Sequence, residues 1–287
     1  MTQLDIRKSI TDKIIDSLNK GRIPWRKPWS GIESPSMPTN FATERRYSGI
    51  NILILWAEAQ ERGYDVDFYA TFNQWKAKGA TIKKGEKAIN VVLYKKYEKT
   101  VQDEKGDESK EQFSILKSFP VFSIHQVEGA GVEKILNQPS KQELQHVQKE
   151  SFEHFVKSIG ADIRFGGSRA FYRPSKDFIQ MPPEQTFESF PSYADTLAHE
   201  LAHWSESRLQ WEGNYAEGEI RAEISAAFTT AALGIQCDAT SENTEAYIQN
   251  WLSELQNDPK YIFKAASAAS KATDFLLDFK KEECISN

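Results

Sequence analysis

The chain has 287 residues, of which 27% are charged, and its formal net charge at pH 7 is -5. No run approaches 18 consecutive apolar residues, so we expect no membrane-spanning helix. The two cysteines, Cys237 and Cys284, are too few for a disulfide framework or a cysteine-based structural zinc site. They favour a reducing, cytoplasmic compartment.

Charge is distributed unevenly along the chain. Residues 1–100 contain 18 lysines and arginines against 11 acidic residues, whereas residues 131–287 contain 15 against 24. A chain of this length also favours two domains. We therefore predict a basic domain at 1–126, a linker at 127–140 and an acidic domain at 141–287. The basic domain should face an anionic partner.

Three helices are predicted in the first domain. Apolar residues recur at helical spacing up to Gly21, where the first helix should end. Ser48 is the expected cap of the second helix and Gly63 its expected end. Residues 70–79 should form a short third helix.

Two strands are predicted after these helices, at 88–99 and 113–126, because both segments are rich in β-branched and aromatic residues. The charged tract between them, 100–112, is expected to form a long hairpin loop. The first domain should therefore combine helices with a small sheet.

The second domain is predicted to be mostly helical with a short antiparallel sheet. Strand segments at 161–167 and 168–182 follow a helix that should end at Gly160. A capping box of Ser192 and Asp195 should begin the next helix. Three further helices are expected, at 216–233, 243–256 and 260–281. The predicted fold class is therefore α+β.

The segment "TLAHELAHWSE" in the second domain contains the H-E-x-x-H spacing. His199 and His203 stand one above the other on a helix face, where both imidazoles can reach one cation at about 2.0–2.1 Å. A metal lowers the pKa of a bound water, and a carboxylate in the position of Glu200 can take its proton. The spacing predicts a metal site with Glu200 as the catalytic base.

A third ligand is expected from the next helix, "AEGEIRAEISAAF". Glu219 and Glu223 share one face of it, and Glu223 follows His203 by 20 residues. We predict His199, His203 and Glu223 as the metal ligands, with Glu219 as the alternative to Glu223. This set suits Zn²⁺ best, although Mn²⁺, Ni²⁺ or Co²⁺ could occupy it. A metal that stabilises the fold and cleaves nothing is the alternative interpretation.

The sequence leaves open which group would stabilise an oxyanion, because no histidine follows His203. Which carboxylate would orient a histidine ligand is a separate open question, and the candidates are Asp195 and Glu219. The candidates for the oxyanion partner are Tyr172, Tyr193, Tyr215, Arg169 and Arg173.

Basic and aromatic residues are interspersed in the first domain. Single-stranded DNA is held by cations along its phosphates and by flat side chains stacked on its bases, and salt weakens such binding. The alternative is that the tryptophans cover a small core and the lysines form a solvated face. The predicted DNA contacts are Trp25, Arg26, Lys27, Trp29, Arg45, Arg46, Tyr47, Asn51, Lys83, Lys84 and Lys87.

Several segments, in the same order, resemble the ArdC-type antirestriction proteins. "IPWRKPWSG" and "PTNFATERRYSGINILILW" resemble their N-terminal domain, and "YADTLAHELAHWSESRL" and "YAEGEIRAEISAAF" resemble their zincin-like C-terminal domain. The helix pair also resembles the gluzincin peptidases. The resemblance implies that His199, His203 and Glu223 fall on metal-ligand positions and Glu200 on the general-base position.

The same resemblance implies a function on conjugative plasmids and other mobile elements. The first domain would bind single-stranded DNA, and the protein would protect incoming DNA from restriction. If the second domain is active, its substrate would be a protein met at that DNA, such as a restriction subunit. The alternative is a non-enzymatic DNA-binding shield with a structural or vestigial metal site.

Overall fold

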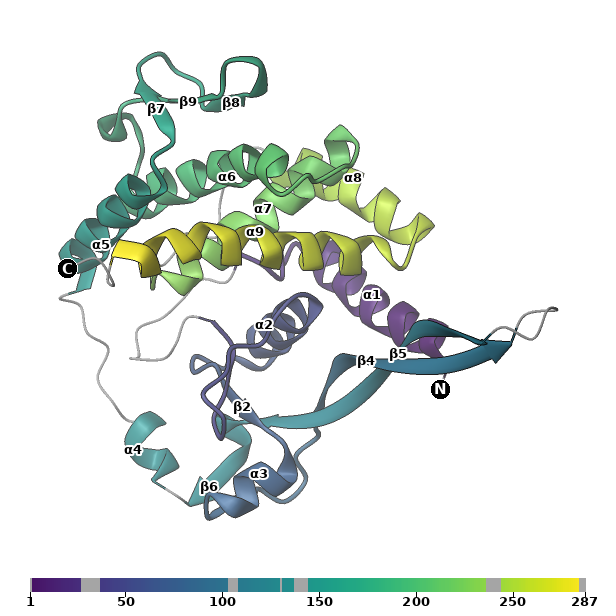
Figure 1. Ribbon diagram of the computed structural model, residues 1–287. Coiled ribbons are helices and arrows are strands. Elements are labelled where there is room, and N and C mark those ends of the chain that lie inside the picture. The colour runs from purple at the N-terminus through teal and green to yellow at the C-terminus, as the bar shows by residue number, and fades with distance from the viewer. Residues whose placement is uncertain are drawn as a thin grey trace.

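The computed structural model describes residues 2–26, 37–102, 108–129, 131–136, 144–235 and 244–283. It has the predicted α+β architecture, with a small sheet in the first half and mainly helices in the second (Figure 1). No helix among the described residues is long and apolar enough to cross a membrane. Four residues named above lie outside the described residues: Lys27, Trp29, Cys237 and Cys284.

In the part of the first half that the structure describes, four helices combine with two sheets. One sheet has the strand order β1-β2-β5-β4, and the other pairs β3 with β6. The elements in chain order are α1 (Gln3–Asn19), β1 (Thr39–Asn40), α2 (Ile50–Arg62), β2 (Phe68–Ala70), α3 (Phe72–Ala77), β3 (Ala80–Ile82), β4 (Ile89–Gln102), β5 (Glu108–Ser123), the 3₁₀ turn η1 (Ile124–Gln126), β6 (Val127–Gly129) and α4 (Val132–Leu136).

The predicted helices are present, but one expected cap is wrong. α2 ends at Gly63, whose left-handed backbone (φ 70°) suits glycine, as predicted. Ser48 does not cap α2. The cap is Gly49, also at positive φ, and its N–H donates to the Ser270 hydroxyl at 2.7 Å. α2 therefore lacks a side-chain cap, and the N–H of its N-cap residue is bonded to a residue distant in sequence.

The hairpin of β4 and β5 is longer than predicted. The strands pair without interruption from Ile89 opposite Val121 to Gln102 opposite Glu108. Most of the tract 100–112, expected to be a loop, thus continues the strands, and only 103–107 lie outside the described residues. β-branched residues at 100 and 101 favour extended backbone, and the ladder of backbone hydrogen bonds does not depend on the tract's charges.

The first part of the expected linker 127–140 is folded against the first half of the chain. β6 pairs antiparallel with β3, and α4 follows it. Val127 and Val132 are buried in a cluster with Val66 and Trp75. Residues 137–140 lie outside the described residues.

The second half is mostly helical, as predicted. Its sheet has the order β7-β9-β8 and is mixed rather than wholly antiparallel as predicted, because β7 runs parallel to β9 while β8 runs antiparallel. The elements are α5 (Leu144–Ile159), β7 (Asp162–Phe165), β8 (Phe171–Arg173), the 3₁₀ turn η2 (Pro174–Lys176), β9 (Phe178–Met181), the 3₁₀ turn η3 (Glu184–Thr186), α6 (Phe190–Arg208), α7 (Tyr215–Ala232), α8 (Thr244–Asn257) and α9 (Tyr261–Glu283).

The motif-bearing helix α6 begins earlier than predicted. Its N-cap is Ser189, whose hydroxyl accepts the Ser192 N–H at 3.2 Å. Pro191 has no backbone N–H, and it is tolerated in the first turn because an N–H at this position would have no partner within the helix. The predicted capping box of Ser192 and Asp195 is therefore wrong, and Asp195 lies inside the helix.

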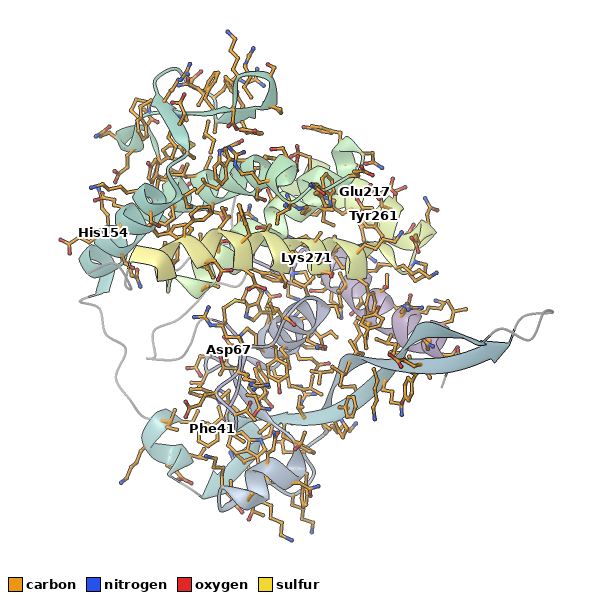
Figure 2. All side chains as sticks on the ribbon, in the orientation of Figure 1. Phe41, Asp67, His154, Glu217, Tyr261 and Lys271 are labelled. Carbon is orange, nitrogen blue, oxygen red and sulfur yellow. The ribbon has the colours of Figure 1, made fainter. Side chains whose placement is uncertain are left out.

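The two halves share one hydrophobic core. α9 lies between α2 and α6, and side chains fill the space between α2 and α9 (Figures 1 and 2). Trp56 of α2 packs edge-on against Phe228 of α7 with ring centroids 5.5 Å apart, and Trp25 packs against Trp251 of α8 at 5.2 Å. The predicted division into two domains thus crosses a continuous core.

Candidate metal centre

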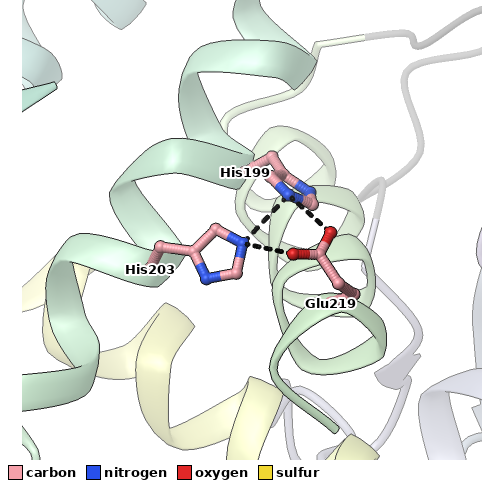
Figure 3. Close-up of side chains that lie close together, drawn as sticks. All are labelled: His199, His203 and Glu219. Atoms are coloured by element: carbon pink, nitrogen blue, oxygen red, sulfur yellow. Dashed lines mark hydrogen bonds and ion pairs between the residues drawn. The ribbon is translucent and has the colours of Figure 1, made fainter. Parts of the chain in front are cut away.

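The two motif histidines and one glutamate converge between α6 and α7 (Figure 3). α6 buries Leu197 and Leu201 on one face. With the helix in this orientation, His199 and His203 face α7. Glu219 projects from α7 to meet them.

The geometry of this cluster fits a metal ion. The Nε2 atoms of His199 and His203 are 3.1 Å apart, and the two Glu219 oxygens lie 3.7 and 3.6 Å from them. Tetrahedral ligands at the usual zinc distances lie about 3.3 Å from one another. The three side chains therefore fit a small divalent cation, and a fourth position would be left for water or substrate.

Glu206 holds His203 in the orientation that a ligand needs. Its carboxylate lies 3.0 Å from Nδ1 of His203. When Nδ1–H donates to this carboxylate, the lone pair of Nε2 faces His199 and Glu219. The buried Arg221 supports Glu206 from behind at 3.5 Å and also donates to the Ser205 hydroxyl at 2.7 Å.

Glu223, the predicted third ligand, lies near Nδ1 of His199, whereas Nε2 of that ring faces the cluster. Its carboxylate is 3.8 Å from Nδ1 of His199, on the side of the ring away from the cluster, and it accepts a 2.8 Å bond from Arg26. The geometry therefore favours Glu219, the alternative named above, as the third ligand.

Asp195 and Arg26 also meet at this centre. Asp195 lies one turn before His199, and its carboxylate is 3.2 Å from the Arg26 guanidinium. Arg26 was predicted to contact DNA, yet only 11% of its side chain is exposed here. An arginine from the first half of the chain is thus part of the surroundings of the metal site in the second.

Burial perturbs the ionisation of the motif residues. It raises the pKa of Glu200 to about 7, despite the opposing effects of His203 and the backbone N–H of Tyr172. It lowers the pKa of His199 to about 4, which keeps this imidazole neutral at physiological pH. Burial would also lower the pKa of His203, but its hydrogen bond to Glu206 and the surrounding carboxylates raise that pKa above the ordinary value.

The five candidate oxyanion partners occupy different surroundings. Tyr172 donates its hydroxyl to Asp177 at 2.9 Å, and its backbone N–H approaches Glu200. Tyr193 is buried, which raises its pKa to about 12. The side chains of the other three candidates are exposed: Tyr215, Arg169 and Arg173.

The predicted DNA contacts divide into structural and exposed residues. Trp25 is only 2% exposed and packs in the core. The Asn51 side chain joins α2 to β4 by two 2.8 Å hydrogen bonds with the Val92 backbone. Tyr47 is half-buried, packed against the core. The basic side chains that are exposed are Arg45, Arg46, Lys83, Lys84 and Lys87.

The β4–β5 hairpin carries an exposed aromatic and basic surface whose residues are not among the predicted DNA contacts. Tyr97 lies with the ammonium groups of Lys95 and Lys117 each 5.7 Å from its ring centroid. Leu93 and Phe119 are exposed nearby, at 54% and 37%. The strand register brings these side chains to one face. All of them lie within the two predicted strands, so the alternation of side chains along those strands could have indicated this surface.

Glu206 and Arg26 were also missed as members of the metal centre. Glu206 follows His203 by three residues, a spacing that places both on one helix face and could have indicated the pair. No local pattern links Arg26 to α6 or α7, because its contact arises from the packing of the two halves.

Comparisons with known proteins match both halves of the chain. Residues 4–122 match the N-terminal domain of anti-restriction factor ArdC, and residues 150–268 match a zincin-like metallopeptidase family. The uncharacterized protein y4eC of Sinorhizobium fredii is 32% identical over 96% of this chain and 92% of its own length. A DNA primase TraC of Escherichia coli is 33% identical over 96% of this chain, which spans only 27% of that primase.

Two crystal structures of the antirestriction ArdC protein from the R388 plasmid are similar to this fold. The metal-free structure gives a TM-score of 0.78 at 36% identity, covering 97% of this chain and 98% of that one. The Mn(II)-bound structure gives 0.73 at 35% identity, covering 95% and 97%. A zincin-like fold together with a metal-bound relative implies a divalent metal here. The chain belongs to the ArdC family of antirestriction proteins.

Proposed function

We propose that this chain is the antirestriction protein of a mobile element, which binds single-stranded DNA and carries a zinc peptidase centre. The family and the plasmid origin of the R388 relative support a function beside incoming DNA. The likeness to part of a DNA primase supports a nucleic-acid partner. The proposed target of the peptidase is a protein met at that DNA, such as a restriction subunit.

The observation that carries the peptidase proposal is the convergence of His199, His203 and Glu219 with Glu200 on the same helix. A metal held by these residues would polarise a scissile carbonyl and lower the pKa of a water. Two imidazoles and one carboxylate suit Zn²⁺, and Mn²⁺ is the first substitute to consider because an ArdC relative binds it. Glu223 is the second candidate for the third ligand.

Glu200 is the proposed general base. Burial leaves 7% of this residue exposed and raises its pKa to about 7, close to the pH at which it must both accept and return a proton. It would take a proton from the attacking water and deliver it to the leaving amine. Tyr172 is the favoured oxyanion partner among the five candidates, because its backbone approaches Glu200.

The proposed DNA surface consists of the exposed cations of the first half and the aromatic face of the hairpin. Arg45, Arg46, Lys84 and Lys87 would contact phosphates, and Tyr97 would stack on a base. Lys83 is a weaker candidate, since its ammonium donates to the His125 carbonyl at 2.9 Å.

Glu200→Gln tests the peptidase proposal. The variant should keep zinc and oligo-dT binding but lose protection of incoming DNA in a conjugation assay against a restricting recipient. Glu212→Gln, the same change at an exposed site of this half, should protect like the wild type. Undiminished protection by Glu200→Gln would exclude proteolysis as the mechanism and favour the non-enzymatic shield.

Charge reversal tests the DNA-binding proposal. Lys84→Glu combined with Lys87→Glu should weaken oligo-dT binding and flatten its dependence on salt. Lys260→Glu combined with Lys271→Glu applies the same charge change to exposed positions of the second half, and should leave binding near the wild-type value. Equal losses from both pairs would show only a net-charge effect.

A further inference from the structure

Arg26 joins the basic first half of the chain to the metal centre. It directly follows Trp25, whose burial against Trp251 fixes the backbone at this point. Its guanidinium reaches Asp195 on α6 at 3.2 Å and Glu223 on α7 at 2.8 Å. One cation thus bridges the two helices that supply the candidate metal ligands.

The two candidate histidine ligands differ in how their outer nitrogens are supported. Nδ1 of His203 has a carboxylate at hydrogen-bonding distance, 3.0 Å from Glu206. Nδ1 of His199 has Glu223 at 3.8 Å, too far for a hydrogen bond. Arg26 binds the other oxygen of the same Glu223 carboxylate at 2.8 Å. The arginine therefore restrains Glu223 at a distance from His199 at which no hydrogen bond forms.

This restraint on Glu223 should affect metal affinity. A carboxylate on the outer nitrogen of a histidine ligand fixes its tautomer and raises its basicity, and losing that partner typically weakens metal binding by about 10- to 100-fold. A divalent cation at the cluster would also repel the guanidinium. Both effects favour Glu223 moving to His199 and Arg26 leaving when a metal binds.

We propose that Arg26 couples metal binding to single-stranded DNA binding. Metal binding draws Glu223 toward His199 and releases the guanidinium, which then becomes available to a phosphate of the DNA. Conversely, DNA that engages Arg26 frees Glu223 to support His199. This inference rests on the proposed function, and linkage requires that each ligand raise the affinity of the other by the same factor.

The first test measures the coupling in the wild-type protein. Oligo-dT affinity is measured by fluorescence anisotropy with zinc or with chelator, in excess Mg²⁺ to keep the ion atmosphere of the DNA constant. Zinc affinity is measured by competition with an indicator, with and without oligo-dT. We expect each ligand to raise the binding affinity of the other roughly tenfold. A coupling factor of one, or mutual weakening, would overturn the proposal.

Arg26→Gln tests whether this residue carries the coupling. Without DNA the variant should bind zinc more tightly than the wild type, and its coupling factor should fall to about one. Arg22→Gln makes the same change four residues earlier, in a hollow between α1 and α2, and should keep the wild-type zinc affinity. Weaker or unchanged zinc binding by Arg26→Gln would mean that Arg26 does not restrain Glu223.

The two proposals fail in different ways. If wild-type protein binds no oligo-dT with or without zinc, the DNA-binding function is wrong, yet the zinc affinity of Arg26→Gln still tests the restraint on Glu223. If oligo-dT binds but shows no dependence on zinc, the function stands and the coupling is refuted. The wild-type measurement decides this even where Arg26→Gln fails to fold.

Discussion

At the scale of single residues, the two histidines of the metal centre differ in the carboxylates that lie near their Nδ1 atoms. His203 is supported by Glu206, which is supported in turn by the buried Arg221, whereas the carboxylate behind His199 is held by Arg26. The two imidazoles therefore have unequal surroundings despite their equivalent places in the motif.

Changing Glu206 should alter metal affinity without touching a metal ligand. Glu206→Leu removes the acceptor for His203 Nδ1–H and should weaken zinc binding by about 10- to 100-fold. Glu206→Gln keeps an oxygen that accepts this N–H and should lose less. Competition with a zinc indicator measures both variants. If the leucine and glutamine variants lose equally, the carboxylate's charge rather than its hydrogen bond would be responsible.

The raised pKa of Glu200, about 7 against an ordinary 4.5, predicts a pH-dependent stability of the metal-free protein. The folded chain holds this proton more tightly than the unfolded chain, so the group's stabilising contribution is full below pH 4.5 and lost as the pH rises to about 7. Metal-free Glu200→Gln should therefore exceed the wild type in stability above pH 7, by on the order of 3 kcal/mol. Urea unfolding in chelator at acid and alkaline pH measures the difference, which should vanish near pH 4.

The sequence predicts the motif residues better than their partners. Helical periodicity alone places His199 and His203 on one face, because that relation is local. It cannot choose between Glu219 and Glu223, which stand one turn apart, since the choice depends on the rotation of α7 against α6. Arg26 reaches the centre only through packing between distant segments.

At the scale of elements, helices were predicted more accurately than their boundaries. α6 carries the motif as expected, but it starts at Phe190, before the predicted capping box of Ser192 and Asp195. Two serines three residues apart both suit an N-cap, and local chemistry does not distinguish them. The length of the β4–β5 hairpin was underestimated for a related reason. Charged residues suggest a loop, but here they pair with a partner strand and continue the ladder.

The cap of α6 can be tested with a matched pair of alanine substitutions. Ser189→Ala removes the acceptor for the Ser192 N–H and should destabilise the protein by about 1 kcal/mol. Ser192→Ala, three residues on and within the helix, should change stability by less than about 0.5 kcal/mol. Chemical denaturation measures both, and the reverse order of effects would restore the capping box that the sequence suggested.

At the scale of the whole molecule, two segments that match different protein families contribute side chains to a shared hydrophobic core. The matched segments 4–122 and 150–268 are separate in sequence, but Trp56 of the first packs against Phe228 of the second. Hydrogen bonds also join the two halves of the chain, from the Gly49 N–H to the Ser270 hydroxyl and from the Thr11 hydroxyl to the Pro259 carbonyl. A shared core gives a physical route by which one half can sense ligands bound to the other.

If the core is shared, both halves should unfold together. Phe228→Ala removes a fully buried ring from α7 and should lower the free energy of unfolding by about 3–5 kcal/mol. Because the ring packs on Trp56, the first half should lose stability equally, so oligo-dT binding and zinc binding should disappear at the same lowered urea concentration. Phe72→Ala, at a position 53% exposed on the first half, should shift neither midpoint by much. Were zinc binding lost well before oligo-dT binding, the halves would be energetically independent, and Arg26 would be left as their main functional connection.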